Sequence, residues 1–288
     1  MDLEGLRYQY RAIRHPAPEF PPTLFVSGAF QTMDSWARFA RSFSPHTTVL
    51  LVDPPGMGAS DLLPPHVGVD FLAECILQLI DVLGYDRINI VAASYGTPAA
   101  FRLAQLHPER LDRVVLAGTM KRIPDHIQDA VRESIDTALR GDRELLADQV
   151  VEGLLCRDLA LPVDRRGLSE RVLRGGLAHM TDSGLQQYAA NSTRLIEHEP
   201  LDIERTVRGP EVLAFTGEHD CFTIPADCLE VARTFERGWF TTVDRADHLF
   251  HIEQFDAVVE LLMRFMRGTL DGAVPGCGPV TRWDDAAN

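Results

Sequence analysis

Ile88-Asn89-Ile90-Val91-Ala92-Ala93-Ser94-Tyr95-Gly96 is an apolar run that leads into a turn built around a serine. Its β-branched residues predict a strand, and the apolar spacing from Pro98 to Leu106 predicts a helix directly after the turn. The positions two before and two after the serine, Ala92 and Gly96, are small enough for strand and helix to pack closely. The pattern therefore predicts a strained turn that exposes the Ser94 hydroxyl.

The remaining sequence repeats this order of strand and helix on both sides. Further strands are expected at residues 23–27, 47–52, 114–117, 211–215 and 239–243, and amphipathic helices at 72–83 and 255–266. Near-continuous apolar strands separated by helices are typical of a parallel sheet that is covered on both faces. We therefore predict an α/β fold, with a mostly parallel sheet and helices on both faces.

One long segment interrupts the alternation. Residues 119–205 carry no strand pattern, and charge-rich helical stretches occur there at 127–139 and 143–155. Because an insert at the carboxyl edge of such a sheet usually forms a lid, we expect a helical lid at 119–205 on a core made of residues 1–118 and 206–268. Residues 269–288 are rich in Gly and Pro and have no periodicity, so we expect a mobile tail there.

Composition restricts the class of protein. The 288 residues are 45% hydrophobic, enough for one large core, and the formal charge of -14 disfavours nucleic acid and anionic membranes as partners. No apolar run approaches the roughly 18 residues of a membrane-spanning helix, and the N-terminus lacks the apolar segment of a signal peptide. The five cysteines are scattered, which argues against a disulfide framework or a metal site. We expect a cytoplasmic protein.

A serine becomes a nucleophile when a base takes its proton and an acid orients that base. Strand 211–215 is followed by Thr216-Gly217-Glu218-His219-Asp220, and strand 239–243 is followed by Arg245-Ala246-Asp247-His248. The order Ser94, Asp220, His248 is the one expected for a serine in this kind of strand-to-helix turn. All three residues come just after a strand's carboxyl end, where loops converge on one crevice. We therefore predict a catalytic triad of Ser94, Asp220 and His248.

Neighbouring residues offer alternatives. Glu218 could replace Asp220 as the acid, while His219 fits the rim of the loop and His251 the start of the following helix. Asp247 could raise the pKa of His248 or simply cap the loop. No carboxylate follows the strand that ends at Ala117, so an acid supplied from there is not expected.

The oxyanion of a tetrahedral intermediate needs two backbone donors. We expect one to be the N–H of Tyr95, next to the nucleophile, and the other the N–H of Ala29, in the loop after strand 23–27. Gly28 suits a turn that brings the backbone close to a ligand. Phe30 and Leu249, the neighbours of Ala29 and His248, are expected to contact the substrate. Lid residues that could line an acyl pocket, or simply pack the lid onto the core, are Leu154, Leu155, Leu173, Leu177, Met180 and Tyr188.

These motifs resemble those of the α/β-hydrolase superfamily over residues 3–267. Asp53-Pro54-Pro55-Gly56-Met57-Gly58-Ala59-Ser60 is similar to the superfamily's D-x-P-G-x-G-x-S loop, a turn expected to support the oxyanion loop. A second, weaker resemblance is to the 3-(3-hydroxyalkanoyloxy)alkanoate synthases of rhamnolipid biosynthesis. It rests on Ser27-Gly28-Ala29-Phe30, on Ala92 through Gly96 and on Asp247-His248-Leu249-Phe250. That family joins or releases 3-hydroxyacyl chains held as thioesters.

The expected function is a serine hydrolase that acts on an ester or thioester of an acyl substrate through an acyl-enzyme. Either hydrolysis or transfer to an acceptor hydroxyl could complete the reaction, without a metal or organic cofactor. An acyl carrier protein or coenzyme A could supply the acyl group, and Arg165, Arg166, Arg171 and Arg174 could form a local patch for an acidic carrier or simply a solvated helix face. Two alternatives are an epoxide hydrolase or dehalogenase, against which a serine at position 94 argues, and a slow ligand-binding or lyase member of the same fold.

Overall fold

The apolar runs of the sequence form the centre of a large sheet in the computed structural model, which describes residues 1–198 and 201–284. Within these residues the sheet has eight strands in the order β10-β9-β8-β7-β6-β4-β5-β3. The parallel central strands are β4 (Thr23–Val26), β5 (Val49–Asp53), β6 (Ile88–Ala93), β7 (Leu111–Ala117), β8 (Glu211–Gly217) and β9 (Arg237–Val243). The expected α/β fold with a mostly parallel sheet is confirmed.

The two edge strands run antiparallel to their neighbours and were not expected from the sequence. They are β3 (Gln9–Ile13), beside β5, and β10 (Thr281–Asp284), beside β9. A short hairpin of β1 (Asp2–Leu3) and β2 (Leu6–Arg7) precedes β3. Edge strands are half exposed, so they lack the continuous apolar run that marks the central strands.

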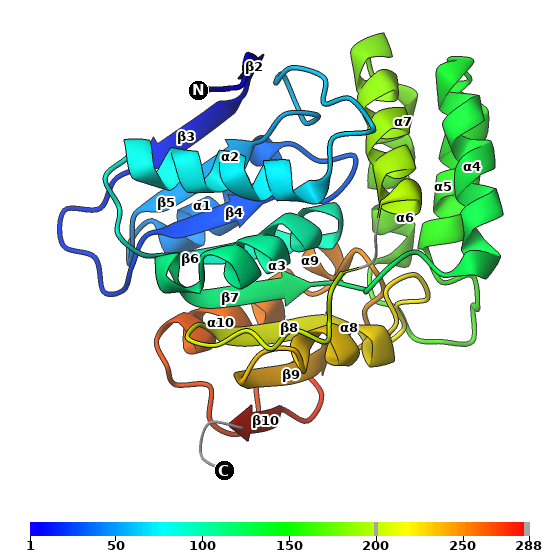
Figure 1. Cartoon of the computed structure of the whole chain (residues 1–288). Coiled ribbons are helices and arrows are strands. Elements are labelled where there is room, and N and C mark those ends of the chain that lie inside the picture. Colours follow the sequence, from blue (N-terminus) through cyan, green and yellow to red (C-terminus); the bar gives the residue numbers. More distant parts are fainter. Residues whose placement is uncertain (199–200, 285–288) are drawn as a thin grey trace.

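Helices cover both faces of the sheet (Figure 1). One face packs against α2 (Val69–Val82), α3 (Thr97–Leu106) and α8 (Pro225–Ala232), with Ile76, Phe101 and Val231 among the buried contacts. The other face packs against α1 (Ala37–Phe43) and α10 (Phe255–Met266), with Phe39 and Phe265 in the second core. Because helices exclude water from both faces of the sheet, the strands expose functional groups only at their ends.

The helical segment between β7 and β8 lies beyond the carboxyl ends of the central strands (Figure 1). It contains α4 (Asp125–Leu139), α5 (Arg143–Leu154), α6 (Arg166–Ala178) and α7 (Asp182–Glu197), which pack around their own apolar cluster. This is the segment expected to form a lid at 119–205; its residues 199–200 lie outside the described ones. No helix in the described part of the chain is both long and apolar enough to span a bilayer.

The C-terminal segment differs from the expected mobile tail. Residues 269–284 are packed against the core: Leu270, Val274 and Trp283 are buried, and β10 extends the sheet. The Trp283 Nε1–H donates to the Phe235 carbonyl at 2.9 Å. Three widely spaced apolar anchors give no periodic signal in a Gly- and Pro-rich sequence, which explains the wrong expectation. Residues 285–288 lie outside the described part.

Candidate active site

Ser94 lies in a tight turn between β6 and α3, with its backbone φ at 45°. This left-handed conformation costs a non-glycine residue about 1–3 kcal/mol, so the surrounding packing must impose it. A Cβ on Gly96 would lie 2.8 Å from the Ser27 carbonyl oxygen, and one on Gly28 would lie 3.2 Å from the Ser94 Cβ. Both glycines therefore let the loop that follows β4 approach the turn closely. Ala92, where a first glycine is common, is fully buried without strain of this kind.

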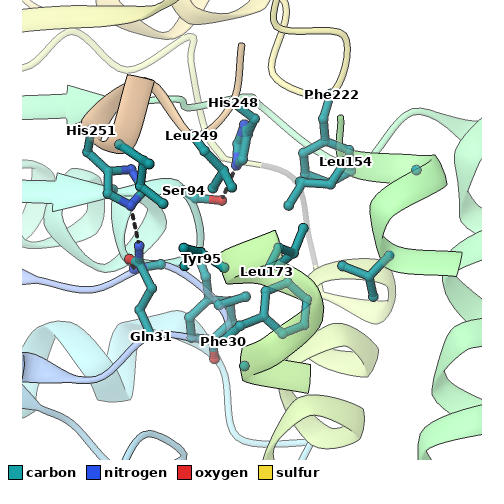
Figure 2. Close-up of a pocket in the computed structure, with 18 of the residues that line it drawn as sticks. Phe30, Gln31, Ser94, Tyr95, Leu154, Leu173, Phe222, His248, Leu249 and His251 are labelled. Atoms are coloured by element: carbon teal, nitrogen blue, oxygen red, sulfur yellow. Dashed lines mark hydrogen bonds between the residues drawn. The ribbon is translucent and has the colours of Figure 1, made fainter. Parts of the chain in front are cut away.

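The structure brings Ser94, His248 and Asp220 together from three separate loops (Figure 2 shows Ser94 and His248). His248 follows β9 and Asp220 follows β8. The Nε2 atom of His248 lies 3.1 Å from the Ser94 Oγ, and its Nδ1 lies 2.8 Å from the Asp220 Oδ2. Each distance is within hydrogen-bonding range, and the chain of contacts is that of a nucleophile, a base and an orienting acid.

Asp220 is surrounded by donors. Besides His248, the hydroxyls of Thr216 and Thr223 donate to Oδ2 at 2.5 and 2.6 Å. The backbone N–H groups of Phe222 and Thr223 donate to Oδ1 at 2.9 and 2.8 Å. Burial alone would raise the pKa of Asp220, but the positive charge of His248 and these donors hold it below the ordinary value. Asp220 is therefore an ionised acceptor.

Asp220 also shapes the titration of His248. Burial lowers the pKa of His248, but the charge and hydrogen bond of Asp220 outweigh burial, and the net pKa is raised. Glu218, the alternative acid, instead accepts a hydrogen bond from the Arg245 backbone at 2.9 Å and is half exposed. His219 lies beside Glu218, with its Nε2 3.7 Å from that carboxylate. The geometry thus brings Asp220, not Glu218, to His248.

Two buried carboxylates hold the loop that carries His248. Asp247 accepts the backbone N–H of His248 at 2.7 Å through Oδ1, and that of Cys156, from the helical segment, at 2.5 Å through Oδ2. Glu253 accepts the backbone N–H of Asp247 at 2.6 Å. Burial raises the pKa of Asp247, and it raises that of Glu253 to about 7. Asp247 thus caps the histidine loop and ties it to the helical segment between β7 and β8, and its charge also contributes to the raised pKa of His248.

The loop that follows β4, expected to carry one oxyanion donor, also lies beside Ser94. Ala29 and Tyr95, expected to provide the two backbone donors, both line the cavity that contains Ser94. None of the hydrogen bonds among the described residues uses the Ala29 N–H. Further along, the Met33 N–H donates to Asp53 Oδ1 at 2.7 Å, so the Asp53–Ser60 turn supports the continuation of this loop, as expected.

Gln31 and His251 hold the loop that follows β4 through contacts that were not expected from the sequence (Figure 2). The Gln31 Oε1 accepts the Gly28 N–H at 3.1 Å, and the Gln31 Nε2 lies 3.0 Å from the His251 Nε2. Because the backbone N–H of Gly28 can only donate, the amide oxygen must face it and the amide nitrogen must donate to His251. His251 is therefore neutral, with its proton on Nδ1. Burial and the nearby charge of His248 lower its pKa to about 4, in agreement.

A cavity of about 470 Å³ opens at Ser94 and extends under the helical segment. Phe30 and Leu249, expected to contact substrate, both line it, and the Phe30 ring stacks on Tyr188 with centroids 5.2 Å apart. Six residues of the helical segment were considered for an acyl pocket. Three of them line the cavity: Leu154, Leu173 and Tyr188. The other three, Leu155, Leu177 and Met180, pack in the apolar cluster of the helical segment. Further apolar residues of the wall are Ile123, Ile127, Val131, Val150, Leu168, Val172, Leu195, Phe222 and Ile252.

Phe222 was not expected at the site. Its ring meets the imidazole of His248 edge-on, with centroids 5.6 Å apart, and it lines the cavity beside Ser94. It follows Asp220 by two residues, so its place could have been found once the acid was assigned. Gln31 and His251 gave no such signal, because their contact joins residues 220 positions apart.

The chain is similar to known hydrolases in its sequence. A family model described as "alpha/beta hydrolase fold" matches residues 21–255. The curated protein "Putative carbamate hydrolase RutD" of Caulobacter segnis is 31% identical over 272 residues, 92% of this chain and 98% of that protein. A "Poly(3-hydroxyalkanoate) depolymerase" of Ectopseudomonas oleovorans is 29% identical over 119 residues, 41% of each protein. The chain thus matches less than half the length of that depolymerase.

Solved structures agree on the fold. The enol-lactonase from Burkholderia xenovorans LB400 superposes with a TM-score of 0.78 at 24% identity, over 91% of this chain and 97% of that one. An α/β hydrolase from a Medee basin deep-sea metagenome, MGS-M2, superposes with a TM-score of 0.79 at 17% identity, over 95% and 98%. The superfamily expected from the sequence is confirmed: this chain belongs to the α/β-hydrolase family, and it is an enzyme of the hydrolase type.

Proposed function

We propose that the protein is a serine hydrolase that cleaves an ester or thioester of an acyl substrate through a covalent acyl-enzyme. The observation that carries this proposal is the hydrogen-bonded series Ser94–His248–Asp220, with distances of 3.1 and 2.8 Å, in the wall of a largely apolar cavity. A serine at position 94 also argues against the epoxide-hydrolase and dehalogenase alternative, which requires an aspartate nucleophile.

The geometry supports a two-step reaction. In the first step His248 Nε2 takes the Ser94 proton while the Oγ bonds to the substrate carbonyl carbon, and the N–H groups of Tyr95 and Ala29 hold the oxyanion. The intermediate then expels the alcohol or thiol, which receives the proton from His248. In the second step His248 deprotonates a water, which attacks the carbonyl carbon of the acyl-enzyme. The bond from that carbon to Ser94 Oγ then breaks, Oγ takes the proton back from His248, and the acid is released. Asp220 keeps the His248 proton on Nδ1 and stabilises its cation.

The cavity indicates the substrate class. Leucine, isoleucine, valine and aromatic side chains dominate its wall, so it suits an acyl chain better than a compact polar group. The depolymerase relative acts, by its name, on a polymer of 3-hydroxyacyl units, and the sequence resemblance also points to 3-hydroxyacyl substrates. We therefore favour medium-chain 3-hydroxyacyl esters or thioesters, carried as a simple ester, on coenzyme A or on an acyl carrier protein.

Transfer to an acceptor hydroxyl is the competing second step. Water and alcohol compete for the same acyl-enzyme, and exclusion of water decides between them.

A cytoplasmic location stays a prediction; the free thiols of all five cysteines fit it.

Product analysis tests the proposal. The enzyme is incubated with a medium-chain 3-hydroxyacyl thioester and, separately, with the corresponding simple ester, and products are identified by mass spectrometry with Ser94→Ala as the blank. Free acid identifies a hydrolase and an ester-linked dimer an acyltransferase; either product must depend on Ser94. No Ser94-dependent product from any ester or thioester would refute the proposal and favour the ligand-binding or lyase alternative.

A further inference from the structure

Polar side chains gather at one end of the active-site cavity. Gln31, Ser35 and Arg38 reach it from the loop after β4, the 3-10 turn Met33–Trp36 and α1, and Arg165 and His251 reach it from the start of α6 and from α9 (Phe250–Glu253). In Figure 2, Gln31 and His251 lie on one side of Ser94, and Leu154 and Leu173 lie on the other. The nucleophile thus lies between this polar group and a mainly apolar wall under the helical segment, in which Ser134, Gln149 and Ser192 are the polar members.

Each of the two arginines contacts a residue of the segment Ile252–Phe255. The guanidinium carbon of Arg38 lies 3.7 Å above the ring centroid of Phe255. The Arg165 Nη1 donates to the Ile252 carbonyl oxygen at 3.3 Å. These two anchors are only three residues apart in the chain, directly after His251. A guanidinium stacked on a ring keeps its N–H groups free in the plane, where they can donate to a carboxylate.

Neither arginine forms an ion pair with another described residue, although the chain carries an excess of acidic groups. The adjacent Asp164 pairs with Arg245 at 2.6 Å and accepts from Gln254 at 2.9 Å. Of the other arginines considered as a local patch, Arg174 pairs with Asp148 and Glu170, and Arg166 donates to backbone carbonyls. Arg38 and Arg165 are therefore the positive groups at this cavity that remain available to a ligand.

We propose that Arg38 and Arg165 form a subsite for a carboxylate carried on the alcohol side of the substrate ester. This inference rests on the proposed function, because it assumes that Ser94 attacks the ester carbonyl. With the acyl chain against the mainly apolar wall, the alcohol half of the ester extends past Ser94 toward Gln31, His251 and the arginines. The substrate class is thus an acyl ester of a hydroxy acid, whose free carboxylate remains on the leaving alcohol.

A pair of matched esters tests the subsite. The first is 4-(hexanoyloxy)benzoate, which carries a carboxylate on the leaving group, and the second is its neutral methyl ester. The ratio of their kcat/KM values is compared between the wild type, Arg38→Gln and Arg165→Gln, so that the intrinsic reactivity of the two leaving groups cancels. Arg41→Gln is the control, because Arg41 lies on the same helix, is exposed and does not line the cavity.

We expect each arginine variant to lower the ratio about fivefold, the effect of one exposed charge contact, and Arg41→Gln to leave it unchanged. Raising the ionic strength should lower the wild-type ratio as well. A second pair with the charge moved, the phenyl monoester of adipic acid and phenyl methyl adipate, should show no such dependence on the arginines.

The outcomes separate the two proposals. Ser94-dependent hydrolysis of both benzoate esters with a ratio that the arginine variants do not change would overturn the subsite alone. The subsite would also be overturned if the arginine variants changed the kcat/KM ratio only for the adipate pair, which carries the carboxylate on the acyl side. Equal hydrolysis by the wild type and Ser94→Ala, or no hydrolysis of any ester or thioester, would overturn the proposed function and the subsite with it.

Discussion

The substitution Asp220→Asn tests how the candidate triad works, because the structure dictates where the new amide must point. The Asp220 Oδ1 accepts two backbone N–H groups, from Phe222 and Thr223, which cannot reverse their polarity. The Oδ2 accepts from Thr216 and Thr223 hydroxyls, which can rotate and accept instead, and from His248 Nδ1. The NH₂ of asparagine must therefore occupy the Oδ2 position and donate to His248.

This amide would invert the tautomer of His248. An imidazole that accepts at Nδ1 carries its proton on Nε2, the atom that must take the proton of Ser94. In serine proteases the same inversion lowers kcat about 10⁴-fold, equivalent to about 5.5 kcal/mol of transition-state stabilisation. We expect a loss of that size with a hydrolysed ester, measured by steady-state kinetics, and little change in the thermal melt.

The matched control is Glu218→Gln, in the same loop, whose side chain accepts from the Arg245 backbone and does not reach His248. We expect its kcat to stay within about twofold of the wild type. Asp220→Asn with a loss below about tenfold, or Glu218→Gln with a loss of thousands, would refute the assignment of Asp220 as the orienting acid.

Three further predictions concern the pH profile, the oxyanion loop and the turn. Because His248 must be neutral to act as base and its pKa is raised above the ordinary 6.5, kcat/KM should fall with unit slope as the pH drops through that raised pKa; a profile flat down to pH 5 would contradict this. Gln31→Leu removes the acceptor of the Gly28 N–H and should lower kcat about 10-fold or more with little change in KM. A variant that is less stable to unfolding but has an unchanged kcat would show that Gln31 has only a structural role. Gly96→Ala places a Cβ 2.8 Å from a carbonyl oxygen and should destabilise by more than about 2 kcal/mol in denaturant unfolding, while Gly175→Ala, with open space around it in α6, should stabilise by about 0.5–1 kcal/mol.

The central strands and the three residues of the candidate triad could be predicted because each leaves a local signal. Apolar β-branched runs mark strands that are buried on both faces. Ser94 follows such a run directly, and Asp220 and His248 lie in the short loops after two others. Parallel strands carry their loops to one edge, so proximity in space follows from the order of strands alone.

Features that depend on distant contacts could not be predicted in this way. The packing of Trp283 under β9 depends on a space that Gly238 leaves, where a Cβ would lie 2.4 Å from the indole, and nothing in the tail's own sequence indicates that space. The pairing of Gln31 with His251, and the position of Arg38 above Phe255, likewise join residues that are more than 200 positions apart. Such contacts become visible only when the loops are placed together.

The most direct test of the central claim is labelling of Ser94 in the folded protein with a fluorophosphonate. The probe reacts with a serine only when a neighbouring base activates it. Our account predicts one adduct per chain, found by mass spectrometry on the peptide that contains Ser94, lost in Ser94→Ala and after denaturation. Absence of an adduct in the folded protein, or an adduct of equal yield in Ser94→Ala, would contradict the assignment of Ser94 as the nucleophile.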